Sequence, residues 1–210
     1  MPTQKTKQQY RLFALIVGVV LIADQALKIY VKTHFQIGEE INLIGSWCRL
    51  HFVENEGMAF GMAFGGTKGK IVLTLLRLIA SGSILWYLLH SIRRGMRTSL
   101  VACITLIFVG AVGNLVDSCF YGLIFNESYY NIAQLFPPQG GYAPLLQGRV
   151  VDMFYCPIID TTLSTGRHFI FFNAIFNIAD AAITIGVFWL IIDQLIAISK
   201  PLESDTSEEN

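Results

Sequence analysis

The sequence predicts an α-helical integral membrane protein with four transmembrane helices, a small extracytoplasmic β-sheet and an irregular outer loop. Of its 210 residues, 53% are apolar and only 14% are charged, and the mean hydropathy is +0.53. Soluble domains carry about 25% charged residues. In addition, four segments are long and apolar enough to cross a bilayer core of about 30 Å at about 1.5 Å per residue. We therefore expect one membrane-embedded domain over residues 1–200.

The four predicted spans cover about residues 11–31, 71–90, 99–120 and 169–199. The first span is too long for the apolar region of a cleavable signal peptide, and no small-residue cleavage site follows it. We therefore expect it to remain as a membrane helix. The formal net charge is zero, and no basic patch with interleaved aromatic residues is visible, which argues against a nucleic-acid partner.

Lysines and arginines predict the orientation of the chain, because they favour the cytoplasmic side of a membrane. They precede the first span and occupy the tight turn between the second and third spans: Lys5, Lys7, Arg11, Arg93, Arg94 and Arg97. Both termini are then cytoplasmic, with residues 201–210 as an acidic, disordered tail, and the connections 34–70 and 121–168 lie outside. Four basic residues on these outer connections are contrary observations: Lys68, Lys70, Arg149 and Arg167.

The two outer connections differ in pattern. Residues 42–44 and 49–53 alternate polar and apolar side chains around a Gly-Ser turn, which predicts two short strands of a small sheet. Residues 125–146 contain consecutive prolines, consecutive glycines and several tyrosines, which predicts an irregular, mobile insertion. The four cysteines lack the spacing of a zinc site, so we expect buried thiols, and a disulfide between Cys119 and Cys156 is conceivable.

Polar residues of the first and third spans fall at a common depth, near the outer leaflet. Asp24 and Lys28 are one helical turn apart and can pair. Asn114 and Asp117 are three residues apart and share a face of their helix. Charged groups inside a membrane are costly, so this placement indicates a function or a tight structural pairing.

The predicted fourth span adds a stripe at the same depth, because Asn173, Asn177 and Asp180 follow helical spacing. Asp152 joins this layer from an apolar stretch of the second outer connection. Polar residues can simply hold helices together, at about 0.6–2 kcal/mol per bond. Four acids, Asp24, Asp117, Asp152 and Asp180, are more charge than such a role needs, and the layer therefore predicts a site.

Two neighbouring carboxyl groups support hydrolysis of a peptide bond. One holds a proton while the other stays charged, so the pair can activate a water molecule and protonate a leaving amine. A small ion-coupled transporter is an alternative, since intramembrane carboxylates also mark ion pathways, although no duplicated half is visible. A second alternative is a non-enzymatic scaffold, which has no need of Asp152 on a loop.

Five blocks of the sequence resemble motifs of the lipoprotein signal peptidase (signal peptidase II) family, in the family's order. They are DQALK at residues 24–28, NEGMAF at 55–60, GAVGNLVD at 110–117, GRVVDM at 148–153 and FNIAD at 176–180. The resemblance implies an aspartic peptidase of the bacterial cytoplasmic (inner) membrane, with Asp152 and Asp180 as its catalytic pair and no metal or cofactor. Its substrate would be a diacylglyceryl-modified prolipoprotein, cut just before the lipid-bearing cysteine, and its other partners would be membrane lipids. We expect a monomer.

The resemblance also implies supporting roles around the pair. It gives Asp24 and Lys28 a structural role, Asn114 and Asn177 a role in orienting the substrate, and Asn55 and Gly57 a place in the loop over the cleft. Asp117 and Arg149 complete the predicted site.

The chain departs from the family pattern in a few places. Ser118 stands where many members have arginine after Asp117, which removes the ion pair that such an arginine makes with Asp117. Arg149 of the second outer connection is a candidate replacement. Met153-Phe154 extends the motif that elsewhere ends directly in phenylalanine. Arg77, near the outer end of the second span, is expected only to reach the interface with its charged end.

Overall fold

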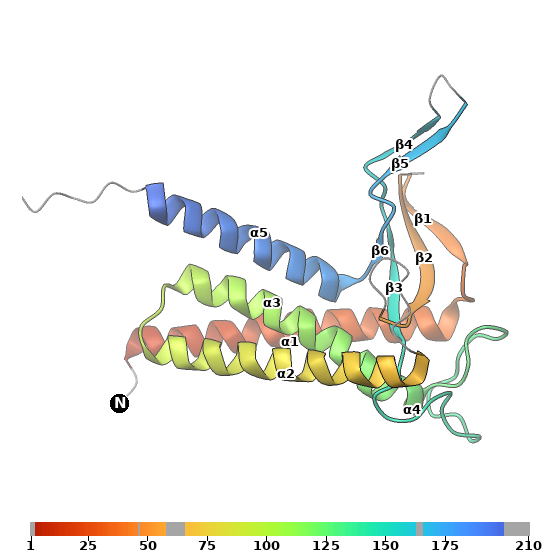
Figure 1. Ribbon diagram of the computed structural model, residues 1–210, viewed down its shortest axis with the longest axis horizontal. Helices are drawn as coiled ribbons and strands as arrows, with labels where there is room; N and C mark the ends of the chain where they lie inside the picture. Colours follow the sequence, from red (N-terminus) through yellow and green to blue (C-terminus); the bar gives the residue numbers. More distant parts are fainter. Residues whose placement is uncertain (1–2, 46, 58–65, 163–165, 200–210) are drawn as a thin grey trace, which may run out of the picture.

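A bundle of long helices with a β-sheet across one end makes up the protein (Figure 1). The computed structural model describes residues 3–45, 47–57, 66–162 and 166–199. The helices are α1 Gln4–His34, α2 Gly66–Arg93, α3 Thr98–Val116, the π-helix η1 Asp117–Tyr121, α4 Gly122–Ile124 and α5 Ile178–Ser199. The strands are β1 Glu40–Ile44, β2 Cys48–Asn55, β3 Val150–Tyr155, β4 Ile159–Thr162, β5 His168–Phe171 and β6 Ile175–Phe176. The predicted acidic tail, 201–210, lies outside the described residues.

Within the described residues, four helices are long and apolar enough to cross a membrane, which confirms the predicted number of spans. They are α1, α2, α5 and the continuous run of α3, η1 and α4. In the most apolar stretch of the third helix, 50% of the residues are buried, against 11%, 17% and 11% in α1, α2 and α5. The third helix is therefore the centre of the bundle, and the other three present most of their apolar surface to the surroundings.

Glycines let α5 approach α3 closely. A Cβ on Gly110 would lie 2.3 Å from the Ala179 carbonyl oxygen, and a Cβ on Gly186 would lie 2.8 Å from the Cys103 carbonyl oxygen. Gly113 is equally confined, because its Cβ would lie 2.9 Å from both Ala179 Cβ and Asp24 Oδ2. Small residues at such an interface bring helix backbones together, as is common in membrane bundles.

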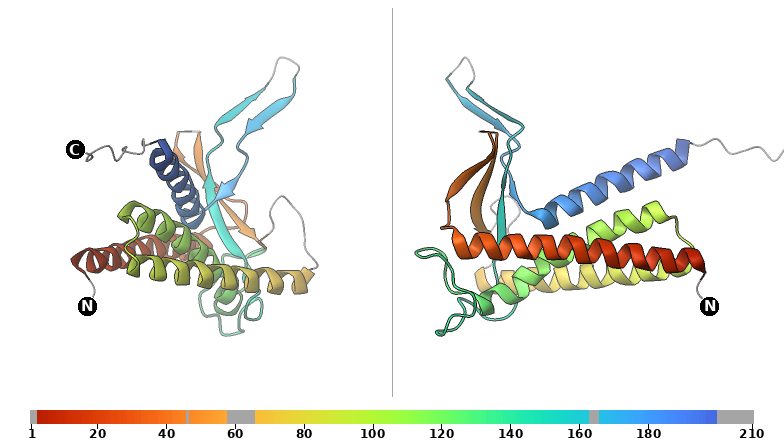
Figure 2. Two further views of the ribbon diagram at one scale, coloured as in Figure 1. Left: turned by 60° about the vertical axis from the view of Figure 1, so that its left-hand side comes forward. Right: turned by 180° about the vertical axis from the view of Figure 1, so that it is seen from behind.

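The sheet has the strand order β1-β2-β3-β6 and is antiparallel throughout, while β4 and β5 form a separate hairpin. The right-hand view of Figure 2 shows the sheet across one end of the bundle, and both views show the hairpin projecting from the sheet. The predicted strands at 42–44 and 49–53 lie within β1 and β2, so this prediction is confirmed. One face of the sheet packs on the end of α1, where Val31 and Phe35 contact a core that contains Phe52 and Met153.

The central strand β3 carries Asp152 and begins directly beside the end of α3. Gly148 donates its backbone N–H to the Ser118 carbonyl oxygen at 2.9 Å. A Cβ at this glycine would lie only 2.0 Å from the Asp117 carbonyl oxygen. The glycine of the GRVVDM block is therefore required by a close approach of two backbones.

The prediction of a fourth span from residue 169 is wrong at its N-terminal end, because the helix begins at Ile178. Residues 168–171 pair with 159–162, and residues 175–176 pair with 154–155. A short apolar run such as Phe169–Phe172 fits a strand as well as a helix, and only pairing partners decide between them. Asn173, Asn177 and Asp180 consequently form no continuous helical stripe.

The cysteine pairing also differs from expectation. The disulfide joins Cys48 to Cys156, not Cys119 to Cys156. Cys48 begins β2 and Cys156 follows β3, and the antiparallel pairing of these strands brings the two residues together. Cys119 is a free, buried thiol in η1.

Candidate active site

The first turn of α5 holds Asp180 through a reciprocal cap with Asn177. The backbone N–H of Asp180 donates to Asn177 Oδ1 at 2.9 Å, and the backbone N–H of Asn177 donates to Asp180 Oδ2 at 3.2 Å. This is the pattern of a capping box, in which two side chains satisfy backbone donors that a helix start leaves free. The FNIAD block is thus the start signal of α5, and the cap fixes the direction of the Asp180 carboxyl group.

Asp152 lies beside this cap, on β3, and only 4% of its surface is exposed. The Asn177 side-chain amide donates to Asp152 Oδ1 at 2.7 Å, and the Asn55 side-chain amide donates to Asp152 Oδ2 at 3.1 Å. Asn177 therefore contacts both acids, with its amide on Asp152 and its backbone on Asp180. The structure brings the two aspartates together where β3 meets α5, as Figure 1 shows for the two elements.

Asn114 of α3 links this pair to the first helix. Its amide donates to Asp180 Oδ1 at 2.8 Å, while its Oδ1 accepts from Asn177 at 3.0 Å and from Lys28 Nζ at 2.9 Å. The cation fixes which end of the Asn114 amide faces it, because an ammonium group offers only donors. The amide hydrogens are then directed at Asp180.

A buried ion cluster supports the site from α1 and η1. Lys28 Nζ lies 2.9 Å from Asp24 Oδ2 and 2.8 Å from Asp117 Oδ2, and all three residues are at most 1% exposed. The predicted pairing of Asp24 with Lys28 is present. Asp24 also accepts the backbone N–H of Ala179 in α5, and Asp117 accepts that of Val151, next to Asp152. The cluster thus ties the elements that carry both aspartates to the bundle.

Gln25 is part of this cluster, and our prediction of the site omitted it. Its amide donates to Asp117 Oδ1 at 2.9 Å and to the Gly113 carbonyl oxygen at 3.2 Å. The Tyr121 hydroxyl donates to Gln25 Oε1 at 3.1 Å. The position of Gln25 beside Asp24 in the DQALK block was the available signal.

The surroundings of Asp152 change its ionisation. Burial, followed by the nearby Asp180 carboxylate, raises the pKa of Asp152 to about 7. The amides of Asn55 and Asn177 oppose this rise because they donate to the charged form. Asp152 consequently stays protonated across a range of pH in which an exposed aspartate is fully ionised.

The turn after β2 covers Asp152 and needs glycine. Asn55 Oδ1 accepts the backbone N–H of Gly57 at 2.8 Å, and Gly57 has a φ of +88°. A Cβ there would lie 2.8 Å from Leu73 Cδ2 and 3.3 Å from both terminal nitrogens of Arg77. The rest of the NEGMAF block, Met58 to Phe60, lies outside the described residues.

The expectation that Arg149 pairs with Asp117 is wrong. Arg149 Nη1 lies 3.0 Å from Glu54 Oε2 and 2.6 Å from Glu127 Oε1, whereas Asp117 pairs with Lys28. Glu54 belongs to β2 and Glu127 to the second connection, so the arginine joins that connection to the sheet. Nothing in the sequence spacing of these three residues indicates their proximity.

Arg77 contacts a residue of the third helix, whereas we expected its charged end only to reach the membrane interface. Its Nη1 donates to the Ser118 hydroxyl at 3.0 Å, and the side chain is half-buried. It therefore reaches the position at which the family pattern leads us to expect an arginine.

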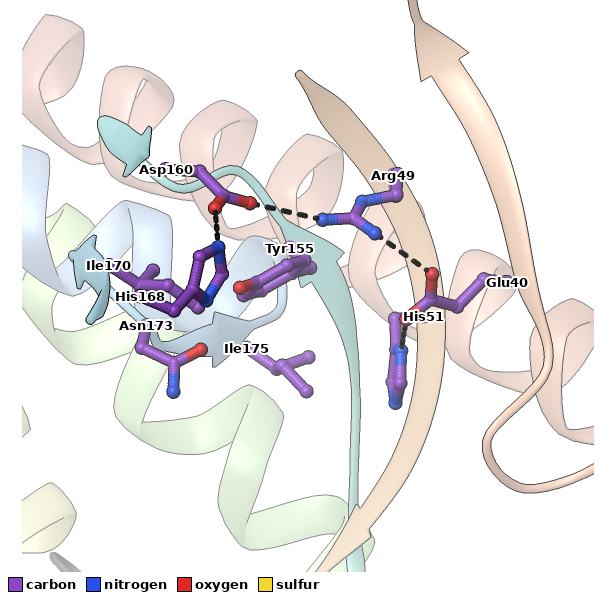
Figure 3. A pocket seen from close by; sticks show the side chains of 9 residues that line it. All are labelled: Glu40, Arg49, His51, Tyr155, Asp160, His168, Ile170, Asn173 and Ile175. Atoms are coloured by element: carbon purple, nitrogen blue, oxygen red, sulfur yellow. Dashed lines mark hydrogen bonds and ion pairs between the residues drawn. The ribbon is translucent and has the colours of Figure 1, made fainter. Parts of the chain in front are cut away.

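A pocket of about 390 Å³ is lined by residues of the sheet and of the β4–β5 hairpin (Figure 3). Its lining includes two side-chain pairs, with Arg49 3.2 Å from Glu40 and His168 2.7 Å from Asp160. β2 contributes Arg49 and His51 to this pocket and, four residues further on, Asn55 to Asp152. The pocket and the candidate active site therefore share strand β2.

Together, the fold and the site define a multi-pass α-helical membrane protein with two hydrogen-bonded carboxyl groups where its helices meet a small sheet. Residues 16–196 match the family model described as signal peptidase (SPase) II. The chain belongs to the signal peptidase II family, and it is a peptidase that removes signal peptides from lipoproteins.

Individual relatives agree with this assignment. A lipoprotein signal peptidase of Porphyromonas gingivalis is 40% identical over 191 residues, which cover 88% of this chain and 83% of that protein. A lipoprotein signal peptidase of Amoebophilus asiaticus is 31% identical over 212 residues, which cover 97% and 86%. A solved bacterial membrane enzyme, determined by the in meso method, superposes with a TM-score of 0.61 at 26% identity and covers 93% of this chain and 94% of its own. The resemblance and the fold class predicted from the sequence are thereby confirmed.

Proposed function

We propose that the protein is an aspartic endopeptidase in which Asp152 and Asp180 are the catalytic pair. The main observation behind this proposal is that Asn177 donates to both carboxyl groups, from its side chain to Asp152 and from its backbone to Asp180. We further propose that the substrate is a diacylglyceryl-modified prolipoprotein and that the cut falls immediately before the lipid-bearing cysteine.

The two aspartates take different roles because their surroundings differ. Asp180 lies at the N-terminus of α5, where the helix dipole favours a negative charge, and it is half-buried. Asp152 is buried, and its raised pKa keeps a proton on it near neutral pH. Asp180 is therefore the base that accepts a proton from water, and Asp152 is the acid.

The reaction then balances without a metal or cofactor. Water adds to the scissile carbonyl carbon while Asp180 takes its proton, and Asp152 donates its proton to the carbonyl oxygen. The resulting diol collapses as the C–N bond breaks: one diol hydroxyl returns a proton to Asp152, and the leaving nitrogen takes up the proton that Asp180 holds. The pair is then in its starting state, and the new carboxylic acid loses its proton to solvent. The products are a signal peptide with a new carboxylate and a cysteine with a free amino group.

Asn55, Asn114 and Asn177 hold the acids in this geometry through their side-chain amides. Lys28, Asp24 and Asp117 fix the backbones behind them. Gly57 lets the turn after β2 lie over the pair, and Arg149 anchors the second connection. A single chain supplies both aspartates, so a monomer surrounded by membrane lipids suffices.

We propose a cytoplasmic (inner) membrane location with both termini in the cytoplasm and the site near the outer leaflet. The positive N-terminal segment and the α2–α3 turn lie at one end of the bundle, since Lys5 Nζ donates to the Gly95 carbonyl oxygen at 3.3 Å. The sheet lies at the other end (Figure 1). Its disulfide is typical of an oxidising compartment. A substrate could enter sideways there with its acyl chains still in lipid.

The test is cleavage of a synthetic prolipoprotein segment with a diacylglyceryl cysteine by purified protein in detergent or liposomes. We expect Asp152→Asn and Asp180→Asn each to abolish cleavage, with mass spectrometry placing the wild-type cut before the modified cysteine. Asp160→Asn, on β4, and Asp193→Asn, on α5, are matched controls that should retain activity. Near wild-type cleavage by either Asp152→Asn or Asp180→Asn would contradict the assignment.

The ion-coupled transporter is the competing function, and the same preparation distinguishes it. In proteoliposomes a transporter carries ions down an imposed gradient and leaves the precursor intact. Membership of a peptidase family favours hydrolysis.

A further inference from the structure

Arg77 contacts the site from α2, through the residues that hold Asp180. Its Nη1 donates to the Ser118 hydroxyl at 3.0 Å, and that hydroxyl donates to the Asn114 backbone carbonyl at 2.9 Å. The Asn114 side chain in turn donates to Asp180 at 2.8 Å. The guanidinium group is therefore two side chains away from one member of the aspartate pair.

The same guanidinium lies against the turn that covers the other member. Both of its terminal nitrogens would be 3.3 Å from a Cβ at Gly57, so the absence of that Cβ makes room for them. Asn55 holds this turn by accepting the Gly57 N–H, and it also donates to Asp152. Arg77 consequently contacts the structures on both sides of the pair.

The charges around Arg77 make it an electrostatic partner of the acids. The carboxylates that attract it are those of Asp180, Asp117 and Asp152, in that order. The charged groups that interact with it come from several elements: Asp117 of η1, Asp152 of β3, Asp180 of α5 and Lys70 of α2 itself. Asp117 is in turn paired with Lys28 of α1, which also pairs with Asp24.

The cation of α1 is already engaged. Lys28 lies between Asp24 and Asp117 at 2.9 Å and 2.8 Å, so its charge is shared by two acids outside the pair. A second positive group near the aspartate pair would favour one negative charge on it in surroundings of low dielectric constant. Arg77 supplies it.

The geometry points to Arg77 as a positioning residue that keeps the aspartate pair singly charged and holds the Asn55–Gly57 turn over it. This inference rests on the proposed function of Asp152 and Asp180. A nearby cation favours the ionised form of a carboxyl group, so its loss makes the base harder to ionise and the acid harder to deprotonate. Both limbs of the pH–rate profile should then move to higher pH.

The test is the pH dependence of kcat/KM between pH 5 and 9 for Arg77→Gln and Arg77→Lys, with the lipid-bearing synthetic precursor. We expect Arg77→Gln, which keeps a donor for Ser118 but loses the charge, to shift the profile upward by about one pH unit. It should also lower kcat/KM over the whole pH range, because the Asn55–Gly57 turn loses the guanidinium group that lies against it. Arg77→Lys keeps the charge and should retain the wild-type pH dependence. Arg93→Gln, at the far end of α2, removes the same charge away from the site and should change nothing.

The outcomes separate this inference from the proposed function. An unshifted profile for Arg77→Gln, or a profile for Arg77→Lys that shifts as far as that of Arg77→Gln, overturns the role of Arg77 while the aspartates stand. If Asp152→Asn or Asp180→Asn still cleaves, the proposed function fails regardless of Arg77. Thermal unfolding in detergent for each variant shows whether a lost rate reflects a lost fold, and Arg77→Lys keeps the inference testable if Arg77→Gln unfolds.

Discussion

At the scale of single residues, Asn177 combines two tasks that are usually separate. It begins α5 as the N-cap and at the same time orients both aspartates. An N-cap contributes about 1 kcal/mol to stability, so the FNIAD block stabilises the fold as well as the site. Gly57 serves the site at a cost to choice of residue. Its positive φ would strain any other amino acid at this position, and the turn beside Asp152 needs that φ.

Asp152 should make the protein less stable as the pH rises. Its pKa is raised to about 7 in the folded protein, against about 3.9 in an unfolded chain. The contribution of this carboxyl group to stability is therefore fully present below about pH 4 and is lost as the pH rises through about 7. We expect Asp152→Asn to raise the Tm by about 2–4 °C at pH 8 and much less at pH 5, measured in detergent. An equal change at both pH values would contradict this linkage.

Gly57→Ala should impair the protein through both strain and contact. The left-handed backbone costs other residues about 1–2 kcal/mol, and the new Cβ would meet Leu73 and Arg77. Gly38→Ala is a matched control, because Gly38 has a φ of +84° and nothing within 4 Å of its Cβ position. Gly57→Ala should lose at least tenfold in kcat/KM, whereas Gly38→Ala should lose only stability. Equal effects on cleavage would show that the contact with Arg77 is irrelevant.

At the scale of elements, the site depends on how closely α3 and α5 approach and on how β3 is held. Glycines at the α3–α5 interface leave room for side chains of other helices. Because Gly113 has no Cβ, the Asp24 side chain of α1 can reach the start of α5. At the other side of the site, the disulfide and the Arg149 ion pairs hold β3 and the second connection to β2. The two aspartates therefore belong to elements that are fixed by different contacts.

Gly113→Ala should separate α3 from α5. Its Cβ would be 2.9 Å from Ala179 Cβ and from an oxygen of Asp24, so the helices or the carboxylate must shift. Overpacking of this kind costs about 1–3 kcal/mol, and we expect a lower Tm and loss of cleavage. Gly82→Ala in α2 is the control, because nothing lies within 4 Å of the Cβ position there. It should leave cleavage unchanged and leave the Tm unchanged or raise it slightly. Wild-type cleavage by Gly113→Ala would argue that the site does not depend on the close approach of α3 and α5.

Removal of the disulfide should loosen the sheet. Cys48→Ser with Cys156→Ser, or reduction of the wild type, opens a cross-link between residues 108 positions apart. Such cross-links stabilise folded proteins by about 2–4 kcal/mol, and thermal unfolding should show the loss. Cys119→Ser is the control, because this thiol is free. If reduction leaves the Tm of the wild type unchanged, the disulfide is not a stabilising element.

At the scale of the whole molecule, the charged N-terminal segment and the α2–α3 turn mark one end, and the sheet and the aspartate pair mark the other. Arg97 of that turn also pairs with Asp193 near the end of α5, at 2.7 Å. Three of the four long helices thus bring charged groups to the same end. This polarity supports the proposed orientation in the membrane.

Labelling of single cysteines tests that orientation. Tyr130→Cys, on the 90% exposed tyrosine of the second connection, should react with a membrane-impermeant maleimide on intact cells with an accessible outer face of the cytoplasmic membrane. Arg94→Cys, in the α2–α3 turn, should react only after permeabilisation. Background from Cys103 and Cys119 should be low because both are buried. The reverse labelling pattern would place the site on the cytoplasmic side.

The sequence by itself determined the helical membrane fold and the residues of the polar layer. Hydropathy follows from composition over about 20 residues, and the spacing of Asp24 from Lys28 predicts their contact because both lie on one helix. Family motifs supplied Asp152 and Asp180 together, although no spacing rule links a strand to a helix start. Hydropathy and helical spacing depend on residues that are close in the sequence, and the aspartate pair was recognised from motifs shared with a family.

Only the tertiary structure decided which distant residues meet. Cys156 pairs with Cys48 because β2 and β3 are neighbouring strands. Arg149, just before β3, pairs with Glu54 of β2 and with Glu127 because the fold brings these separate segments together. The start of α5 at Ile178, and not at residue 169, depends on pairing between strands that no local pattern shows. Arg77 meets Ser118 because α2 packs on α3. Contacts between separate elements depend on packing of the whole chain, and they hold the aspartate pair in place.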